Sequence, residues 1–230
     1  MGALELGLLA AMCWGFHDVC VRFISQKTPI SACILTVLIV GLIFHIGLMI
    51  PTKEITVISK SAFVLATIAG VSFVIASFCL YYAFKRGPVK LVAPLIASYP
   101  ILSISWAIWI GTPISKFQIL AVLAIIFGVS IVAVLSDISE EKIPPIGKTI
   151  ALSLIAAIAF ACTFASGQAA AELSPHMSAT LVTRIISIML CAIIIYFAGL
   201  KYWPGKSAIP WLIAMGCADG LALWCVFSAG

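Results

Sequence analysis

The chain has 230 residues, of which 63% are hydrophobic and 9% are charged, with a formal net charge of +5. Soluble domains are about half apolar and a quarter charged, so this composition excludes an ordinary soluble domain and places the chain in a lipid bilayer. The basic residues lie on short connections between apolar runs. They therefore indicate membrane topology and contact with lipid headgroups, and not nucleic-acid binding.

Eight runs are long and apolar enough to be transmembrane helices, which need about 20 mostly apolar residues each. The first run carries Glu5, has no Lys or Arg before it and no small-residue cleavage pattern after it, so we interpret it as a span and not as a signal peptide. The sequence predicts an all-α, polytopic membrane helical bundle with spans at residues 4–24, 32–50, 61–84, 89–110, 115–135, 149–171, 178–200 and 208–227.

An internal repeat appears when the chain is aligned with itself at a shift of 146 positions. The identical residues that fall together include Leu8 and Leu154, Pro29 and Pro175, residues 60–62 and 206–208, Gly70 and Gly216, and Cys79 and Cys225. The first copy holds five spans, and an odd number means that the second copy enters the membrane from the opposite side. The sequence therefore predicts an inverted-topology repeat.

Three segments follow from this repeat. Residues 1–135 form the first five-span copy, residues 136–148 form a polar linker, and residues 149–230 form three spans of the second copy. We expect a full architecture of ten spans, in which the counterparts of residues 85–135 would follow Gly230.

Several short motifs resemble those of the EamA-type family of the drug/metabolite transporter superfamily. The matching residues are Trp14, Gly15, His17, Asp18 and Arg22 in the first span, Thr28 and Pro29 before the second, Tyr81, Tyr82, Ala83 and Lys85 at the end of the third, and Tyr99 and Pro100 in the fourth. The resemblance implies a fold of inverted repeats and the transport of small metabolites.

The chain departs from the family pattern at two places. The family usually has Gly-Glu after the fourth helix, where this chain has Gly111 and Thr112, and it often has an arginine early in the second helix. Only the second copy carries that arginine, as Arg184. We expect Thr112 to cap the fifth span, with Pro113 at its first helical position.

Ionisable residues inside spans are functional candidates, because each costs about 2.5 to 3.5 kcal/mol on insertion scales at a helix centre. Trp14, Asp18 and Arg22 share one helical face, and His17 lies beside them. This cluster either lines a cavity, where it binds a charged substrate or carries a coupling proton, or Asp18 neutralises Arg22 as that side chain reaches the interface. Both interpretations remain open.

A second polar group is predicted in the second copy, where Arg184 and Asp219 would form a pair between the seventh and eighth spans. His45 stands alone in the second span, and a packing histidine is the preferred interpretation.

The fourth span should bend or open, because Pro94 and Pro100 each remove a backbone hydrogen bond. Hydroxyl and aromatic side chains near the bend would then face a cavity, or the bend is only a structural kink. The complete set of candidate substrate-binding or coupling residues is Trp14, His17, Asp18, Arg22, Tyr82, Ser98, Tyr99, Ser103, Trp106, Arg184 and Asp219, with Pro94 and Pro100 at the kink.

The chain contains no phosphate-binding glycine loop, nucleophile elbow or paired metal-binding cysteines. We therefore expect no enzyme activity, no cofactor, no metal site and no ATP-driven pump.

The predicted function is secondary transport of small metabolites, such as amino acids or amphiphilic compounds, by alternating access in the plasma (inner) membrane. Expected partners are the small-molecule substrate and the bilayer, with proton coupling, a homo-oligomer or a complementing subunit left open and no nucleic acid. The alternative is a truncated, non-transporting membrane protein or a helical partner subunit.

The distribution of Lys and Arg favours an external N-terminus, whereas ten-span relatives are expected to keep both termini in the cytoplasm. The sequence leaves the orientation open.

Overall fold

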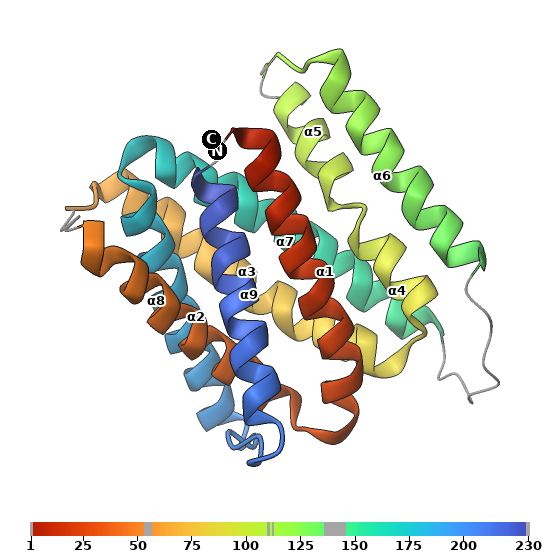
Figure 1. Cartoon of the computed structure of the whole chain (residues 1–230), viewed down its shortest axis with the longest axis vertical. Coiled ribbons are helices and arrows are strands. Elements are labelled where there is room, and N and C mark those ends of the chain that lie inside the picture. The colour runs from red at the N-terminus through yellow and green to blue at the C-terminus, as the bar shows by residue number, and fades with distance from the viewer. Residues whose placement is uncertain (1, 53–56, 110, 112, 136–145, 229–230) are drawn as a thin grey trace. The chain divides into compact units, whose positions relative to one another are not determined.

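A computed structural model describes residues 2–52, 57–109, 111, 113–135 and 146–228. Every regular element in these residues is an α-helix (Figure 1). The helices are α1 (Ala3–Lys27), α2 (Ile30–Thr52), α3 (Lys60–Arg86), α4 (Val89–Ile96), α5 (Tyr99–Trp109), α6 (Lys116–Leu135), α7 (Ile146–Leu173), α8 (His176–Phe197) and α9 (Ile209–Ser228). They divide into two compact units, Met1–Val74 with Thr163–Gly230, and Ile75–Cys162.

All eight predicted spans correspond to helices, which confirms the polytopic helical bundle. In the described residues, seven segments are long and apolar enough to cross a membrane, and α4 and α5 together count as one of them. The described apolar part of α6, Lys116–Gly128, is shorter. The predicted linker falls almost wholly on residues 136–145, which lie outside the described residues.

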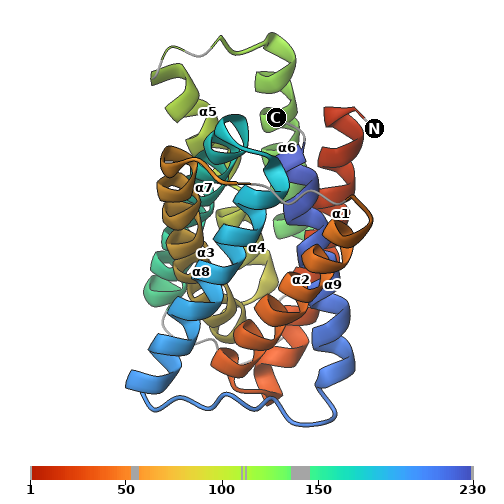
Figure 2. The same ribbon diagram turned by 90° about the vertical axis from the view of Figure 1, so that its left-hand side faces the viewer.

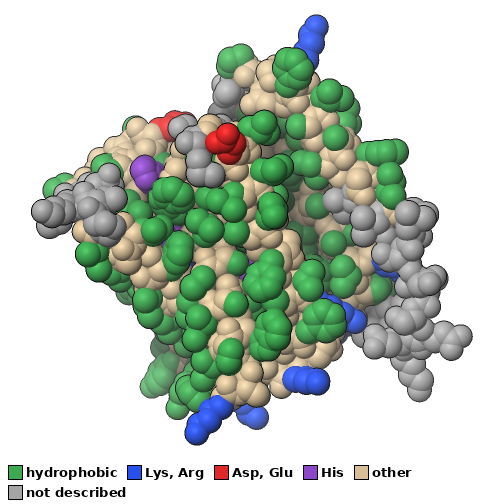
Figure 3. All heavy atoms as spheres, in the orientation of Figure 1, with side chains coloured by type: hydrophobic (Ala, Val, Ile, Leu, Met, Phe, Trp, Pro, Cys, Tyr) green, Lys and Arg blue, Asp and Glu red, His purple; other side chains and the backbone are tan. Residues whose placement is uncertain are grey.

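The surface of the first unit is suited to lipid. On α1, large apolar side chains recur on one face and are between 58% and 83% exposed, namely Leu4, Leu8, Met12, Val19 and Phe23. Figure 3 shows hydrophobic side chains over the face where α1 and α9 lie side by side, with basic side chains at its lower edge. Such an apolar belt with charges at its edge is expected where a helix faces hydrocarbon and ends at the headgroups.

Two prolines start corresponding helices of the first unit. The Pro29 carbonyl accepts the Cys33 N–H at 3.0 Å, and the Pro175 carbonyl accepts the Ser178 N–H at 3.0 Å. Proline suits this place because its fixed φ is already helical and its missing N–H would have no partner there. The proline-led start of the second span, predicted at Thr28 and Pro29, is therefore confirmed.

The seventh predicted span ends earlier than expected, at Phe197 and not at Leu200. Gly199 has a φ of 61°, a left-handed conformation that glycine adopts without a steric penalty. The chain reverses there, and the Leu200 N–H donates to the Ile195 carbonyl at 2.9 Å. This bond closes the helix in the manner of a Schellman motif.

The connection from α1 to α2 and the connection from α7 to α8 reproduce the repeat found in the sequence. The last residues of α1 and α7, Lys27 and Leu173, are 146 positions apart, and so are the first residues of α2 and α8, Ile30 and His176. In Figures 1 and 2, α2 and α8 run in opposite directions. Opposite directions of corresponding helices are the hallmark of an inverted-topology repeat.

Packing inside the first unit repeats as well. A Cβ added at Gly70 would lie 2.7 Å from the Thr183 carbonyl oxygen of α8, and one added at Gly216 would lie 3.0 Å from the Val37 carbonyl oxygen of α2. Both members of each contact are shifted by the same 146 positions, with their order exchanged. Exchanged contacts of this kind are what a two-fold relation between the copies produces.

In the second unit, the predicted fourth span is two helices. Helix α4 contains Pro94 and ends at Ile96, and α5 begins at Tyr99, directly before Pro100. Because Pro100 has no N–H, it cannot donate to the Ile96 carbonyl. The predicted bend or opening is confirmed at Pro100, whereas Pro94 lies inside α4.

The fifth span begins within one residue of its predicted bound, but its predicted cap is wrong. Pro113 lies outside the helix, which begins at Lys116, and Thr112 lies outside the described residues. The Ser115 hydroxyl accepts the Gln118 N–H at 3.2 Å, while the Gln118 side-chain oxygen accepts the Ser115 N–H at 2.7 Å. This reciprocal capping box satisfies two N–H groups at the start of α6.

Candidate functional site

The first unit contains a buried ion pair between α8 and α9. Arg184 Nη1 donates to Asp219 Oδ2 at 2.6 Å, and the two residues are 0% and 3% exposed. The predicted pairing of these residues is therefore confirmed. Neither charge could be buried alone at acceptable cost, so the pair ties the two helices together.

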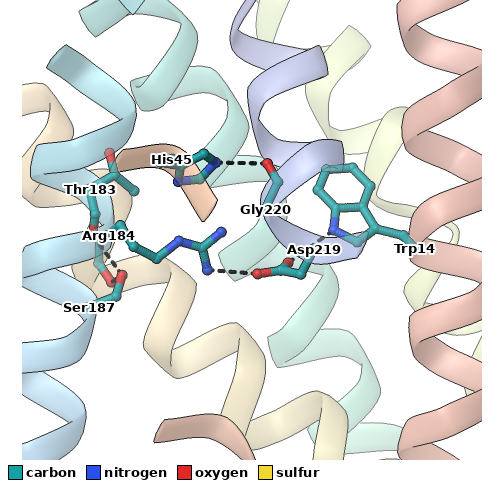
Figure 4. A network of polar contacts seen from close by, with 8 residues as sticks. Trp14, His45, Thr183, Arg184, Ser187, Asp219 and Gly220 are labelled. Carbon is teal, nitrogen blue, oxygen red and sulfur yellow. Dashed lines mark hydrogen bonds and ion pairs between the residues drawn. The ribbon is translucent and has the colours of Figure 1, made fainter. Parts of the chain in front are cut away.

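A third helix joins this pair through Trp14 of α1. The indole Nε1–H donates to Asp219 Oδ1 at 3.2 Å, so the two carboxylate oxygens of Asp219 have different donors (Figure 4). The indole ring also packs against Phe164, with ring centroids 5.1 Å apart. Trp14 thus belongs to a site that lies between α1, α8 and α9.

Helix α2 supplies His45, which is fully buried. Its Nε2 lies 2.7 Å from the Gly220 carbonyl oxygen of α9. A carbonyl oxygen can only accept, so Nε2 carries the proton and Nδ1 of the neutral ring is an acceptor. The bond supports the packing role expected of His45, but it leaves Nδ1 without a described partner.

The other side of α8 is held to α3 by two hydroxyls. Thr183 donates to the Ala66 carbonyl at 3.3 Å, and Ser187 donates to the Gly70 carbonyl at 3.0 Å. Arg184 lies next to Thr183 in α8, and its guanidinium lies 5.2 Å from the centre of the Phe73 ring of α3. These contacts hold the buried cation against α3 and an aromatic face.

In the cluster predicted around Asp18, His17 Nδ1 lies 3.2 Å from Asp18 Oδ1. His17 is buried, whereas the Asp18 side chain is 35% exposed. Arg22 is half-buried on the same helix. Trp14 contacts Asp219 of α9 and so joins two sets of residues that the sequence presents separately.

The remaining candidates lie in the second unit. The Ser98 hydroxyl donates to the Leu95 carbonyl at 2.6 Å, and the Ser103 hydroxyl donates to the Tyr99 carbonyl at 3.2 Å. These hydroxyls therefore satisfy carbonyls at the break between α4 and α5. Trp106 is 51% exposed and packs on Trp109, and Tyr82, on α3, is 40% exposed. A binding role for these five residues stays a prediction.

Sequence reasoning missed Gly41 and Phe73, which both contact the Arg184 guanidinium. The repeat held a signal for one of them, since Phe73 and Asp219 are 146 positions apart and so occupy equivalent places. In the part of the chain that the structure describes, no three His, Cys, Asp or Glu side chains are arranged to hold a metal ion.

Comparison with known proteins finds a relative in sequence and similar solved structures. A Methanocaldococcus jannaschii protein described as uncharacterized, MJ1333.1, is 28% identical over 133 residues, which make up 57% of this chain and 96% of that protein. A solved crystal structure has a similar fold, with a TM-score of 0.72 and 14% sequence identity. The alignment covers 98% of this chain and 77% of the chain in that crystal structure. At that identity the likeness shows the fold alone.

The EamA-like transporter family matches residues 1–134, which is all but the last residue of the first copy that the repeat defines. This match covers more than half of the 230 residues. It agrees with the bundle of apolar helices and its buried ion pair. The chain belongs to the EamA-like transporter family, whose members are membrane transporters of the drug/metabolite type.

Proposed function

We propose that the chain is a secondary transporter of small metabolites, such as amino acids or amphiphilic compounds, that works by alternating access in the plasma membrane. Residues 1–135 and 149–230 act as the two inverted copies. Membership of the EamA-like transporter family supports transport. The exchanged glycine contacts support the two-fold relation that alternating access uses.

The observation that carries this proposal is the place of the buried ion pair. Arg184 and Asp219 come from α8 and α9 of the second copy, while Trp14 and His45 come from α1 and α2 of the first. In transporters built from inverted repeats, substrate and coupling ions bind at the repeat interface near the middle of the membrane. The pair therefore marks the substrate site, with Asp219 as the candidate coupling carboxylate.

Uptake by purified protein in liposomes tests the proposal. Labelled metabolites of several classes are offered under an imposed proton or sodium gradient, without ATP, and uptake is compared with that of protein-free liposomes. We expect gradient-driven uptake that falls in Asp219→Asn and is retained in Glu172→Gln, an exposed residue of α7. Only variants that remain monodisperse are compared.

Two results would count against the proposal. No flux above protein-free liposomes from well-folded protein would contradict transport itself. Loss of flux in Asp18→Asn with normal flux in Asp219→Asn would move the coupling site to the His17 and Asp18 contact in α1.

A further inference from the structure

One edge of the Arg184 guanidinium carries two hydrogen-bond donors for which no described residue supplies an acceptor. Nη1 is bound to Asp219, whereas Nε and Nη2 have no hydrogen-bond partner although the side chain is 0% exposed. In a planar guanidinium, Nε and Nη2 lie side by side and point the same way. This pair of donors matches the spacing of the two oxygens of a carboxylate.

Helix α2 passes close to one face of this guanidinium at Gly41. A Cβ added at Gly41 would lie 3.1 Å from Arg184 Cζ, 3.3 Å from Nη2 and 3.4 Å from Nε. The added carbon would lie nearest to Cζ, with both nitrogens slightly farther away, which places it over the flat face of the guanidinium and not at the Nε and Nη2 edge. One turn further along α2, the buried Nδ1 of His45 is a second polar atom without a described partner. Figure 4 shows His45, Arg184 and Asp219 converging between α2, α8 and α9.

The fold itself does not require charges here. The positions equivalent to Arg184 and Asp219 in the first copy are Leu38 and Phe73, which are 1% and 5% exposed. The equivalent positions of the first copy are thus occupied by two buried apolar side chains. A buried cation with unsatisfied donors is costly, so its presence in only one copy indicates a ligand and not a packing need.

We propose that the Nε and Nη2 edge of Arg184 binds the carboxylate group of the transported substrate. This inference rests on the proposed transport function and names the chemical class of its substrate. Arg184 and Asp219 already cancel each other's charge, so a second carboxylate needs a balancing positive charge. That charge comes either from an ammonium group of the same molecule, which Asp219 would attract, or from a proton taken up with an anion.

The test is ligand binding by the purified chain in detergent, measured by calorimetry. The probes are L-alanine and L-phenylalanine, which carry an ammonium group, and L-lactate, which does not. The matching amides lack only the carboxylate. We expect at least one acid to bind and its amide to bind about tenfold more weakly or worse, because the amide cannot accept from both donors as an anion.

Two variants locate the site. Arg184→Lys keeps the positive charge but loses the planar edge, and Gly41→Ala places a methyl carbon against the face of the guanidinium, 3.1 Å from Cζ, so that the edge must shift from its position. Each should weaken binding of the acid by about tenfold or more. Gly47→Ala is the matched control, because it makes the same change on the same helix where an added Cβ has nothing within 4 Å. Melting curves establish that each variant is folded.

The inference is overturned if none of the acids binds. It is also overturned if an acid binds no more tightly than its amide, or if it binds Arg184→Lys and Gly41→Ala as tightly as it binds the wild type. Flux of a compound without a carboxylate, unchanged in Arg184→Lys, would leave the transport proposal standing and remove this one. Binding that depends on Arg184 without any flux in liposomes would do the reverse.

Discussion

Replacing Asp219 with Asn tests the buried ion pair with little change in side-chain size. The structure gives the expected cost, since Arg184 is 0% exposed and loses the acceptor that lies 2.6 Å from Nη1. Breaking a buried pair by neutralising one member costs about 3 to 5 kcal/mol, because the other charge stays buried without compensation. The Asn oxygen can still accept one hydrogen bond, so we expect a loss of about 3 kcal/mol in the free energy of unfolding.

A double-mutant cycle separates the pair from its parts. Arg184→Leu leaves Asp219 with the Trp14 indole as a donor, and it should destabilise the protein by a similar amount. The double variant Arg184→Leu/Asp219→Asn removes both charges, so it should be more stable than the sum of the single changes predicts, by up to about 3 kcal/mol.

Unfolding in mixed micelles, followed by tryptophan fluorescence, measures these differences. Glu172→Gln serves as the control, because an exposed carboxylate outside the pair should change stability by less than about 0.5 kcal/mol. If Asp219→Asn also stays within about 0.5 kcal/mol of the wild type, the reasoning that ties stability to the pair is wrong.

Three further changes test the fold. Gly70→Ala should cost about 1 to 3 kcal/mol, because its Cβ would lie 2.7 Å from the Thr183 carbonyl oxygen, whereas Gly15→Ala has open space and should be neutral in the same unfolding assay. Ser115→Ala removes the cap of α6 and should cost about 0.5 to 2 kcal/mol, with faster amide exchange confined to the first turn of that helix; unchanged exchange would argue against the cap. Pro100→Ala restores an N–H at the break between α4 and α5, so amide exchange there should slow, and an unaltered rate would mean that the prolines do not cause the break.

Much of the fold could be predicted from the sequence because a bilayer permits few backbone conformations. A run of apolar residues must satisfy its own backbone polar groups, so each of the eight predicted runs became helical. Proline marked the helix starts at Pro29 and Pro175 and the break before Pro100. Where local hydrogen bonds decide an end, as at Ser115 and Gly199, the prediction was wrong by three residues or fewer.

The ion pair shows where prediction from the sequence ends. Arg184 and Asp219 could be paired in advance, because an ionisable side chain inside a span must find an opposite charge. The sequence alone suggested that Trp14 belongs with Asp18 and Arg22, since helical spacing reveals only neighbours on the same helix. Its hydrogen bond to Asp219 was decided by the packing of α1 against α9.

The sequence by itself determined the membrane class, the repeat and the charges that must be buried, since these depend on composition, spacing and the cost of desolvation. Only the tertiary structure decided that Gly41 and Phe73 surround the Arg184 guanidinium and that its Nε and Nη2 remain unpaired. The physical reason is that these features depend on which faces of α2, α3 and α8 meet, and apolar helices with few polar residues carry little information about their facing sides.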